Sequence, residues 1–206
     1  MKFDKEQLQM VLALFVVAVI AATLLGLTDI VTRGPIAAAE KEALRSALAQ
    51  VLPKHANDAQ GDMFVIGKEK RAVSVYPGKD KAGKINGFAW EVTAPDGYAG
   101  SIRILVGLYP DGNIHAIRVT AHKETPGLGD GIVNDSGWLA AFAGQNLESR
   151  NWKVKKDGGD FDQFTGATIT PRAVVKAVKG ALAFFATNRE LMFAPVAEEN
   201  PGEEKP

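Results

Sequence analysis

The chain has 206 residues, with 24 lysines and arginines, 24 aspartates and glutamates, and no cysteine; at this length one domain, or one domain with an anchor, is expected. The zero net charge and the lack of a basic block argue against a nucleic-acid-binding protein, because nothing supplies a patch that neutralises phosphates. The absence of cysteine excludes disulfides, thiol catalysis, Cys-ligated zinc and Cys-held iron–sulfur clusters, so redox chemistry would require an organic cofactor.

The first predicted element is a membrane anchor. Residues 10–27 contain no charged side chain, and a helix of that length can cross a hydrocarbon core of ~30 Å. A cleaved signal peptide is the alternative, but the apolar run exceeds the usual ~7–15 residues and no small-x-small cleavage site precedes Thr32-Arg33. We therefore expect an uncleaved anchor. The flanking positive charges are nearly balanced, and their slight N-terminal excess favours a C-terminal part outside the cytoplasm.

A second, amphipathic helix is predicted after the anchor. Gly34-Pro35 is expected to end the first helix, and apolar residues then recur with a 3.6-residue period from Ile36 to Leu52, where Pro53 stops the run. This segment is either a juxtamembrane stalk or the first helix of the domain. The expected organisation is an N-terminal tail and anchor over 1–34, a domain over 35–194 and a disordered tail over 195–206, rich in Pro and Glu.

The domain itself is expected to be α+β, with mostly antiparallel strands and flanking helices. The turn residues Pro110-Asp111-Gly112 predict a hairpin, and broken alternation near Ala116 indicates a bulge in its second strand. A short helix is expected over 137–143. The predicted strands cover 72–76, which ends at Pro77-Gly78, and then 87–93, 101–109, 113–120 and 152–156.

The C-terminal part of the domain contains a strong helix start. Thr170 is a predicted N-cap, and Pro171 suits the first helical position, where its missing N–H costs nothing. The residues 165–168 then lie on the turn that leads into a helix N-terminus, which favours an anion and phosphate above all. A capped surface helix with a small-residue turn is the alternative. The helix is expected to end near Thr187, with one apolar face made by Val174, Val175, Val178, Ala181, Leu182 and Phe185.

No local metal site is expected from the histidines. His55, His115 and His122 stand apart, and none shows the short spacing of a local metal-binding pair. The loop around Gly127 and Gly129 also lacks the G-x-G-x-x-G spacing of a dinucleotide fingerprint.

Three segments together resemble FMN-binding domains. Residues 97–108 resemble a strand entry of these domains, and Glu124-Thr-Pro-Gly-Leu-Gly129 resembles their ETPGLG loop. Asp162-Gln-Phe-Thr-Gly-Ala-Thr168 matches Asp-x-x-Ser/Thr-Gly-Ala-Thr, which resembles the recognition sequence of a flavin transferase. The chain is similar to the covalent FMN-binding family that includes the G subunit of Rnf (Rsx) ion-translocating electron-transport complexes and the C subunit of sodium-translocating NADH:quinone reductases.

The resemblance implies that FMN is bound covalently to Thr168 through a phosphoester bond. It also implies a transferase recognition sequence made by Asp162, Thr165, Gly166, Ala167 and Thr168. The implied cofactor-binding residues are Glu124, Thr125, Gly127, Leu128, Gly129, Thr165, Gly166 and Ala167. Leu128 suits an apolar contact with the flavin ring, while Glu124 and Thr125 suit its polar edge. For Glu124 the alternative is a solvated charge at the end of a hairpin.

The resemblance further implies an electron carrier subunit rather than a complete enzyme. Its partners would be other membrane subunits of the complex and, for maturation, a flavin transferase; no nucleic acid is expected. The chain would cross the bacterial inner membrane once, with its domain on the periplasmic side. The alternative function is an anchored extracytoplasmic scaffold or binding module without a redox cofactor, in which Thr-Gly-Ala-Thr is only a helix cap.

Overall fold

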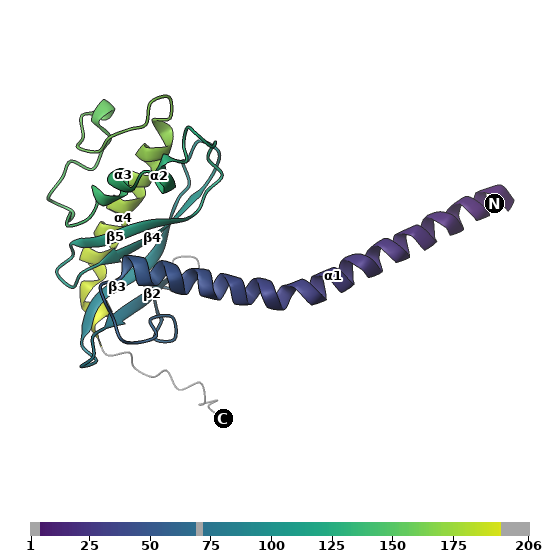
Figure 1. The fold of residues 1–206 in the computed structure, drawn as a ribbon, viewed down its shortest axis with the longest axis horizontal. Helices are drawn as coiled ribbons and strands as arrows, with labels where there is room; N and C mark the ends of the chain where they lie inside the picture. The colour runs from purple at the N-terminus through teal and green to yellow at the C-terminus, as the bar shows by residue number, and fades with distance from the viewer. Residues whose placement is uncertain (1–4, 69–71, 195–206) are drawn as a thin grey trace. The chain divides into compact units, whose positions relative to one another are not determined.

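The computed structural model describes residues 5–68 and 72–194, so the predicted tail over 195–206 lies outside the described residues. The chain divides between Leu44 and Arg45 into two compact units. Its elements are shown in Figure 1.

The first element is one long helix, α1 (Lys5–Val51). It contains the predicted anchor and is long and apolar enough to cross a membrane. The prediction that Gly34-Pro35 ends this helix is wrong, because α1 continues through Pro35. Proline removes a single N–H, and residues 37–42 are alanines, glutamates and a lysine, which are strong helix formers. The predicted stop before Pro53 is confirmed.

The core of the domain is a five-stranded antiparallel sheet in the order β1-β2-β3-β4-β5, which confirms the predicted fold class. Its strands are β1 (Phe64–Ile66), β2 (Val73–Lys79), β3 (Ile85–Ala94), β4 (Ile102–Leu108) and β5 (Ile114–Ala121). The expected bulge near Ala116 is present: Gly107 pairs with Ala116 and Leu108 with Ile114, which leaves His115 as the extra residue.

Two features of the sheet differ from the prediction. Strand β1 was not anticipated, and β2 continues through Pro77-Gly78 instead of ending there. Proline is tolerated in β2 because β1 pairs only with Val73–Val75, so that Pro77 lies on an edge of the sheet.

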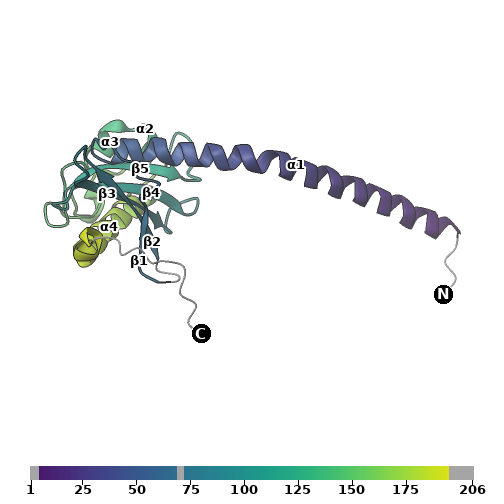
Figure 2. The same ribbon diagram turned by 90° about the horizontal axis from the view of Figure 1, so that it is seen from below.

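Helix α4 (Ile169–Phe193) covers one face of the sheet and packs on β3 and β4. All six residues of its predicted apolar face are buried, and the helix extends beyond the predicted end near Thr187. Phe88 and Trp90 of β3 contact Phe185 on this side. The last turn of α1, with Ala47, Leu48 and Val51 buried, lies on the other face (Figure 2).

The remaining helices are short and lie between β5 and α4. They are α2 (Gly131–Asn134), α3 (Ser136–Ala140) and the 3₁₀ helix η2 (Lys155–Asp157). The short helix expected over 137–143 is present as α3, which begins at Ser136 and ends at Ala140. The strand predicted over 152–156 is absent, because no neighbouring strand is available: Val154 makes one isolated bridge with Phe161, and η2 follows it.

Candidate functional site

The segment that carries the predicted acceptor threonine begins with a tight turn. The Ala167 N–H donates to the Phe164 carbonyl at 3.1 Å, and Gly166 has a φ of 78°, as the third residue of a type II turn requires. Thr165 and Gly166 are exposed, and Ala167 and Thr168 are half-buried. The turn therefore presents its small residues at the surface, immediately before α4.

Thr168 occupies the N-cap position of α4, and its side chain makes no capping hydrogen bond. The prediction that Thr170 is the N-cap is therefore wrong: α4 begins at Ile169, and Thr170 and Pro171 are its second and third residues. Pro171 still lies in the first turn, where a missing N–H costs nothing. Thr170 is fully buried, and its hydroxyl donates to a carboxylate oxygen of Glu124 at 2.5 Å instead of capping the helix.

The 124–129 loop folds against this helix start. The N–H groups of Leu128 and Gly129 both donate to the Thr125 carbonyl at 3.1 Å, and Gly127 has a φ of 76°. At Gly129 a side chain would not fit, because an added Cβ would lie 2.8 Å from Oε2 of Glu124 and 3.0 Å from Oγ1 of Thr170. The loop and the first turn of α4 thus meet directly.

Leu128 lies at the exposed tip of that loop, beside the acceptor turn. Its side chain is 51% exposed, and a Cβ added to Gly166 would lie 3.7 Å from its Cδ2. Two further large apolar side chains near the same segments are exposed, Tyr98 at 71% and Ile169 at 44%. Sequence reasoning did not single out Tyr98, although an aromatic residue in a Gly-rich loop that leads into a strand could have signalled it.

Glu124 is not a solvated charge, because it is only 4% exposed. One carboxylate oxygen accepts the Ala99 N–H at 3.0 Å and the other accepts the Thr170 hydroxyl. Thr125, by contrast, is exposed. The two residues that are expected at the polar edge of the flavin therefore have different environments, with Glu124 directed inward and Thr125 at the surface.

The two cations on the first turns of α4, Arg172 and Lys176, are paired with carboxylates. Arg172 donates to Asp157 through Nε at 2.6 Å and Nη2 at 2.9 Å. The hydrogen bond from Arg172 holds the pKa of the Asp157 carboxyl below its usual value, and the same bond raises the pKa of Arg172. Lys176 pairs with Asp96. An anion at Thr168 would therefore rely mainly on the N–H groups of the first turn rather than on these side chains.

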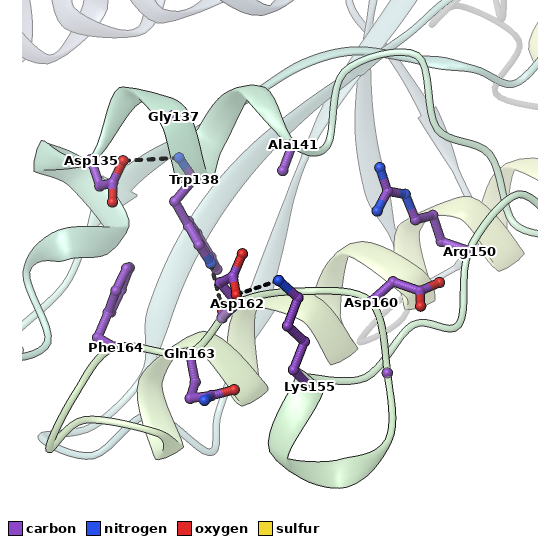
Figure 3. A pocket seen from close by; sticks show the side chains of 11 residues that line it. Asp135, Gly137, Trp138, Ala141, Arg150, Lys155, Asp160, Asp162, Gln163 and Phe164 are labelled. Carbon is purple, nitrogen blue, oxygen red and sulfur yellow. Dashed lines mark hydrogen bonds and ion pairs between the residues drawn. The ribbon is translucent and has the colours of Figure 1, made fainter.

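The first half of the recognition sequence borders a separate cavity of about 640 Å³ (Figure 3). Asp162 pairs with Lys155 across 2.6 Å, and its carbonyl accepts the indole N–H of Trp138 at 2.8 Å. The lining includes Asp162, Gln163 and Phe164 but neither Thr165–Thr168 nor the 124–129 loop. The structure thus brings the predicted flavin-contacting residues together outside this cavity.

No group of three or more histidine, aspartate or glutamate side chains that could hold a metal ion is found in residues 5–68 and 72–194. The chemistry that the site offers is a threonine hydroxyl on an exposed turn, unpaired N–H groups at a helix start and an apolar side chain beside them. This set fits a phosphate ester with an attached aromatic ring.

Comparison with known proteins gives consistent matches. The model of the FMN-binding domain family matches residues 97–183. The chain is 45% identical over 192 residues to the G subunit of the ion-translocating oxidoreductase complex of Aliivibrio fischeri (strain MJ11), covering 88% of this chain and 90% of that one. It is 41% identical over 213 residues to the corresponding subunit of Pseudomonas aeruginosa (strain UCBPP-PA14), covering 97% of each chain.

Among solved structures, a crystal structure of Shewanella oneidensis NqrC is similar, with 23% sequence identity and a TM-score of 0.48. The match covers 65% of this chain and 70% of that one.

Proposed function

Because this chain belongs to the family of the G subunits of ion-translocating oxidoreductase complexes, we propose that it is a membrane-anchored electron carrier whose FMN is attached to Thr168 by a phosphoester bond. FMN, when bound, supplies the capacity to accept and release electrons. The protein supplies the attachment point, the orientation of the cofactor and the electrostatic environment.

The observation that carries the proposal is the state of the Thr168 hydroxyl. A threonine at an N-cap position usually bonds to the helix N–H groups that follow it, but Thr168 makes no such bond. Its hydroxyl is therefore available to an external enzyme, and the exposed Thr165 and Gly166 leave room for a bulky flavin beside it. After attachment, the N–H groups at the start of α4 would stabilise the phosphodiester by roughly 0.3–1 kcal/mol, which orients the group more than it retains it.

Leu128 and Thr125 are the proposed contacts with the flavin ring. Leu128 lies next to Gly166, so a ring linked to Thr168 can cover its exposed side chain and remove apolar surface from water. Thr125 is exposed on the same loop and offers a hydroxyl to the polar edge of the ring. Gly127 and Gly129 shape the loop that presents both side chains.

Maturation requires a partner enzyme, and the proposed partner is a flavin transferase that reads residues 162–168. Asp162, Thr165 and Gly166 are all exposed, which makes the recognition sequence accessible to a second protein. The other proposed partners are the remaining subunits of the complex. In the cell, we place α1 across the inner membrane and the domain on the periplasmic side, where the transferase would act.

The orientation predicts the outcome of a labelling experiment. Because the chain contains no cysteine, a single Lys179→Cys on the exposed surface of α4 provides a unique thiol. A membrane-impermeant maleimide should label Lys179→Cys in intact spheroplasts and label the control, Lys5→Cys at the start of α1, only after lysis. The reverse pattern would place the domain in the cytoplasm.

The attachment is tested by flavin fluorescence after denaturing electrophoresis of the full-length chain, produced together with a flavin transferase. A fluorescent band at the mass of the chain is the expected result. A dark band would refute covalent attachment and favour the scaffold function.

A further inference from the structure

Glu124 is a buried carboxylate that holds three separate segments together. It accepts the Ala99 N–H from the loop before β4 and the hydroxyl of Thr170 from the first turn of α4, while its own backbone belongs to the 124–129 loop. Burying such a group is costly unless its oxygens are hydrogen-bonded, and both of its oxygens are used. The proposed flavin attachment site is thus built around one acidic side chain.

The backbone around Glu124 is shaped to receive this carboxylate. An added Cβ would lie 2.9 Å from Oε1 at Gly97 and 2.8 Å from Oε2 at Gly129. Both contacts are closer than real Cβ atoms permit, so a side chain at either position would displace the Glu124 carboxylate; at Gly97 it would also meet the Gly100 carbonyl oxygen at 2.2 Å. Two glycines from different loops therefore leave the space that the carboxylate occupies.

Within residues 5–68 and 72–194 the Glu124 carboxylate has no ion-pair partner, and the neighbouring His122 accepts the Glu124 backbone N–H through Nδ1 at 3.2 Å. The two cations on the first turns of α4 are engaged with Asp157 and Asp96. The partners of Glu124 are neutral donors, and its Thr170 partner is two residues from Thr168. A negative charge in a low-dielectric environment acts over a longer distance than one in water.

We propose that the negative charge of Glu124, buried against the acceptor segment, lowers the reduction potential of the attached flavin. The inference rests on the proposed attachment of FMN to Thr168. Electrons that enter the flavin bring negative charge to it, and the buried carboxylate opposes this addition. Glu124 gains and loses no electron: the reductant is the external electron donor, and the carboxylate acts only through its field.

The test is a spectroelectrochemical titration of flavin-loaded full-length protein. Glu124→Gln keeps the shape of the side chain and removes its charge. At a fixed electrode potential, the ratio of reduced to oxidised flavin should rise several-fold relative to wild type, because a charge that opposes reduction is removed from a partly desolvated position. Thr170→Val keeps the Glu124 carboxylate but removes the hydroxyl that donates to it and partly compensates its charge. The ratio of reduced to oxidised flavin should therefore fall below that of wild type.

The matched control is Glu91→Gln. Glu91 also accepts a threonine hydroxyl, that of Thr120 at 2.8 Å, but its side chain is 37% exposed and lies near Arg103. Its removal should leave the ratio unchanged, because water screens an exposed charge.

Several outcomes would overturn the proposal. If Glu124→Gln leaves the ratio of reduced to oxidised flavin unchanged, the charge does not affect the reduction potential. If Glu124→Gln and Thr170→Val shift the ratio equally and in the same direction, the cause is structural disorder at the site and not the charge. A folded Glu124→Gln chain that takes up no flavin would also contradict it, because removing a charge beside an incoming phosphate should ease attachment. If Glu124→Gln does not fold, Thr170→Val decides alone: a ratio at or above that of wild type refutes the proposal. A wild-type chain without flavin instead refutes the proposed function.

Discussion

Thr168→Val should abolish covalent flavin attachment to the full-length chain. Valine has the shape of threonine but no hydroxyl, so no phosphoester can form. The fold should be retained, because the Thr168 side chain is half-buried and makes no capping bond that the substitution would break. In-gel fluorescence should therefore fall from a full signal to background, while thermal unfolding of the protein without flavin stays close to that of wild type.

Two matched variants sharpen this prediction. Thr168→Ser restores the hydroxyl on a smaller side chain and should regain at least part of the signal. Thr165→Val alters the other threonine of the acceptor turn, which is exposed and three residues earlier. Fluorescence that survives Thr168→Val and disappears in Thr165→Val would move the attachment to Thr165. Fluorescence that survives in both variants would exclude both threonines as the attachment site.

Gly107→Ala should destabilise the domain strongly, whereas Gly180→Ala should not. An added Cβ would lie 1.9 Å from the Val51 carbonyl oxygen and 2.5 Å from its carbon. These are backbone atoms at the end of α1, which cannot rotate away as a side chain can. His115, the bulged residue of β5, also bonds to this carbonyl through Nδ1 at 2.9 Å. The substitution must displace the last turn of α1 from β4, at a cost of about 3 kcal/mol.

The measurement is thermal unfolding of the detergent-solubilised full-length chain, in which a loss of that size lowers Tm by roughly 6–12 °C. Gly180→Ala is the control. Gly180 lies within α4, and nothing stands within 4 Å of an added Cβ. Because alanine is a better helix former than glycine, this variant should be stabilised by about 0.4–1 kcal/mol. A Gly107→Ala protein as stable as wild type would show that the end of α1 is not seated on β4 as described.

The sequence was sufficient to predict the elements that depend on residues close together in the chain. The uncharged run 10–27 is part of one helix, the turn at Gly112 joins β4 and β5, and the broken alternation near Ala116 corresponds to a bulge. The apolar face of α4 is buried as its spacing predicts. For β5 and α4 the periodicity of the apolar residues carries the information, because an exposed and a buried face need different side chains. The turn is indicated by its Pro-Asp-Gly sequence, and the first helix by the length of its uncharged run.

The features that could not be predicted depend on contacts between residues far apart in the chain. Glu124 is separated from Thr170 by 46 residues, and an acidic residue at the end of a hairpin is ordinarily solvated. The same contact diverts Thr170 from the capping role that its type and position indicated. Pro35 does not end α1, because the strong helix formers over residues 37–42 outweigh one lost N–H. A rule based on proline alone does not take such neighbours into account.

The most direct test of covalent attachment at Thr168 is the mass of the purified full-length chain, followed by fragmentation of the peptide that contains residues 162–172. The expected result is an added mass equal to FMN less one water, carried by Thr168, together with an intact N-terminal helix. A chain at its unmodified mass after production with an active flavin transferase, or a flavin carried by any other residue, would contradict the proposed attachment.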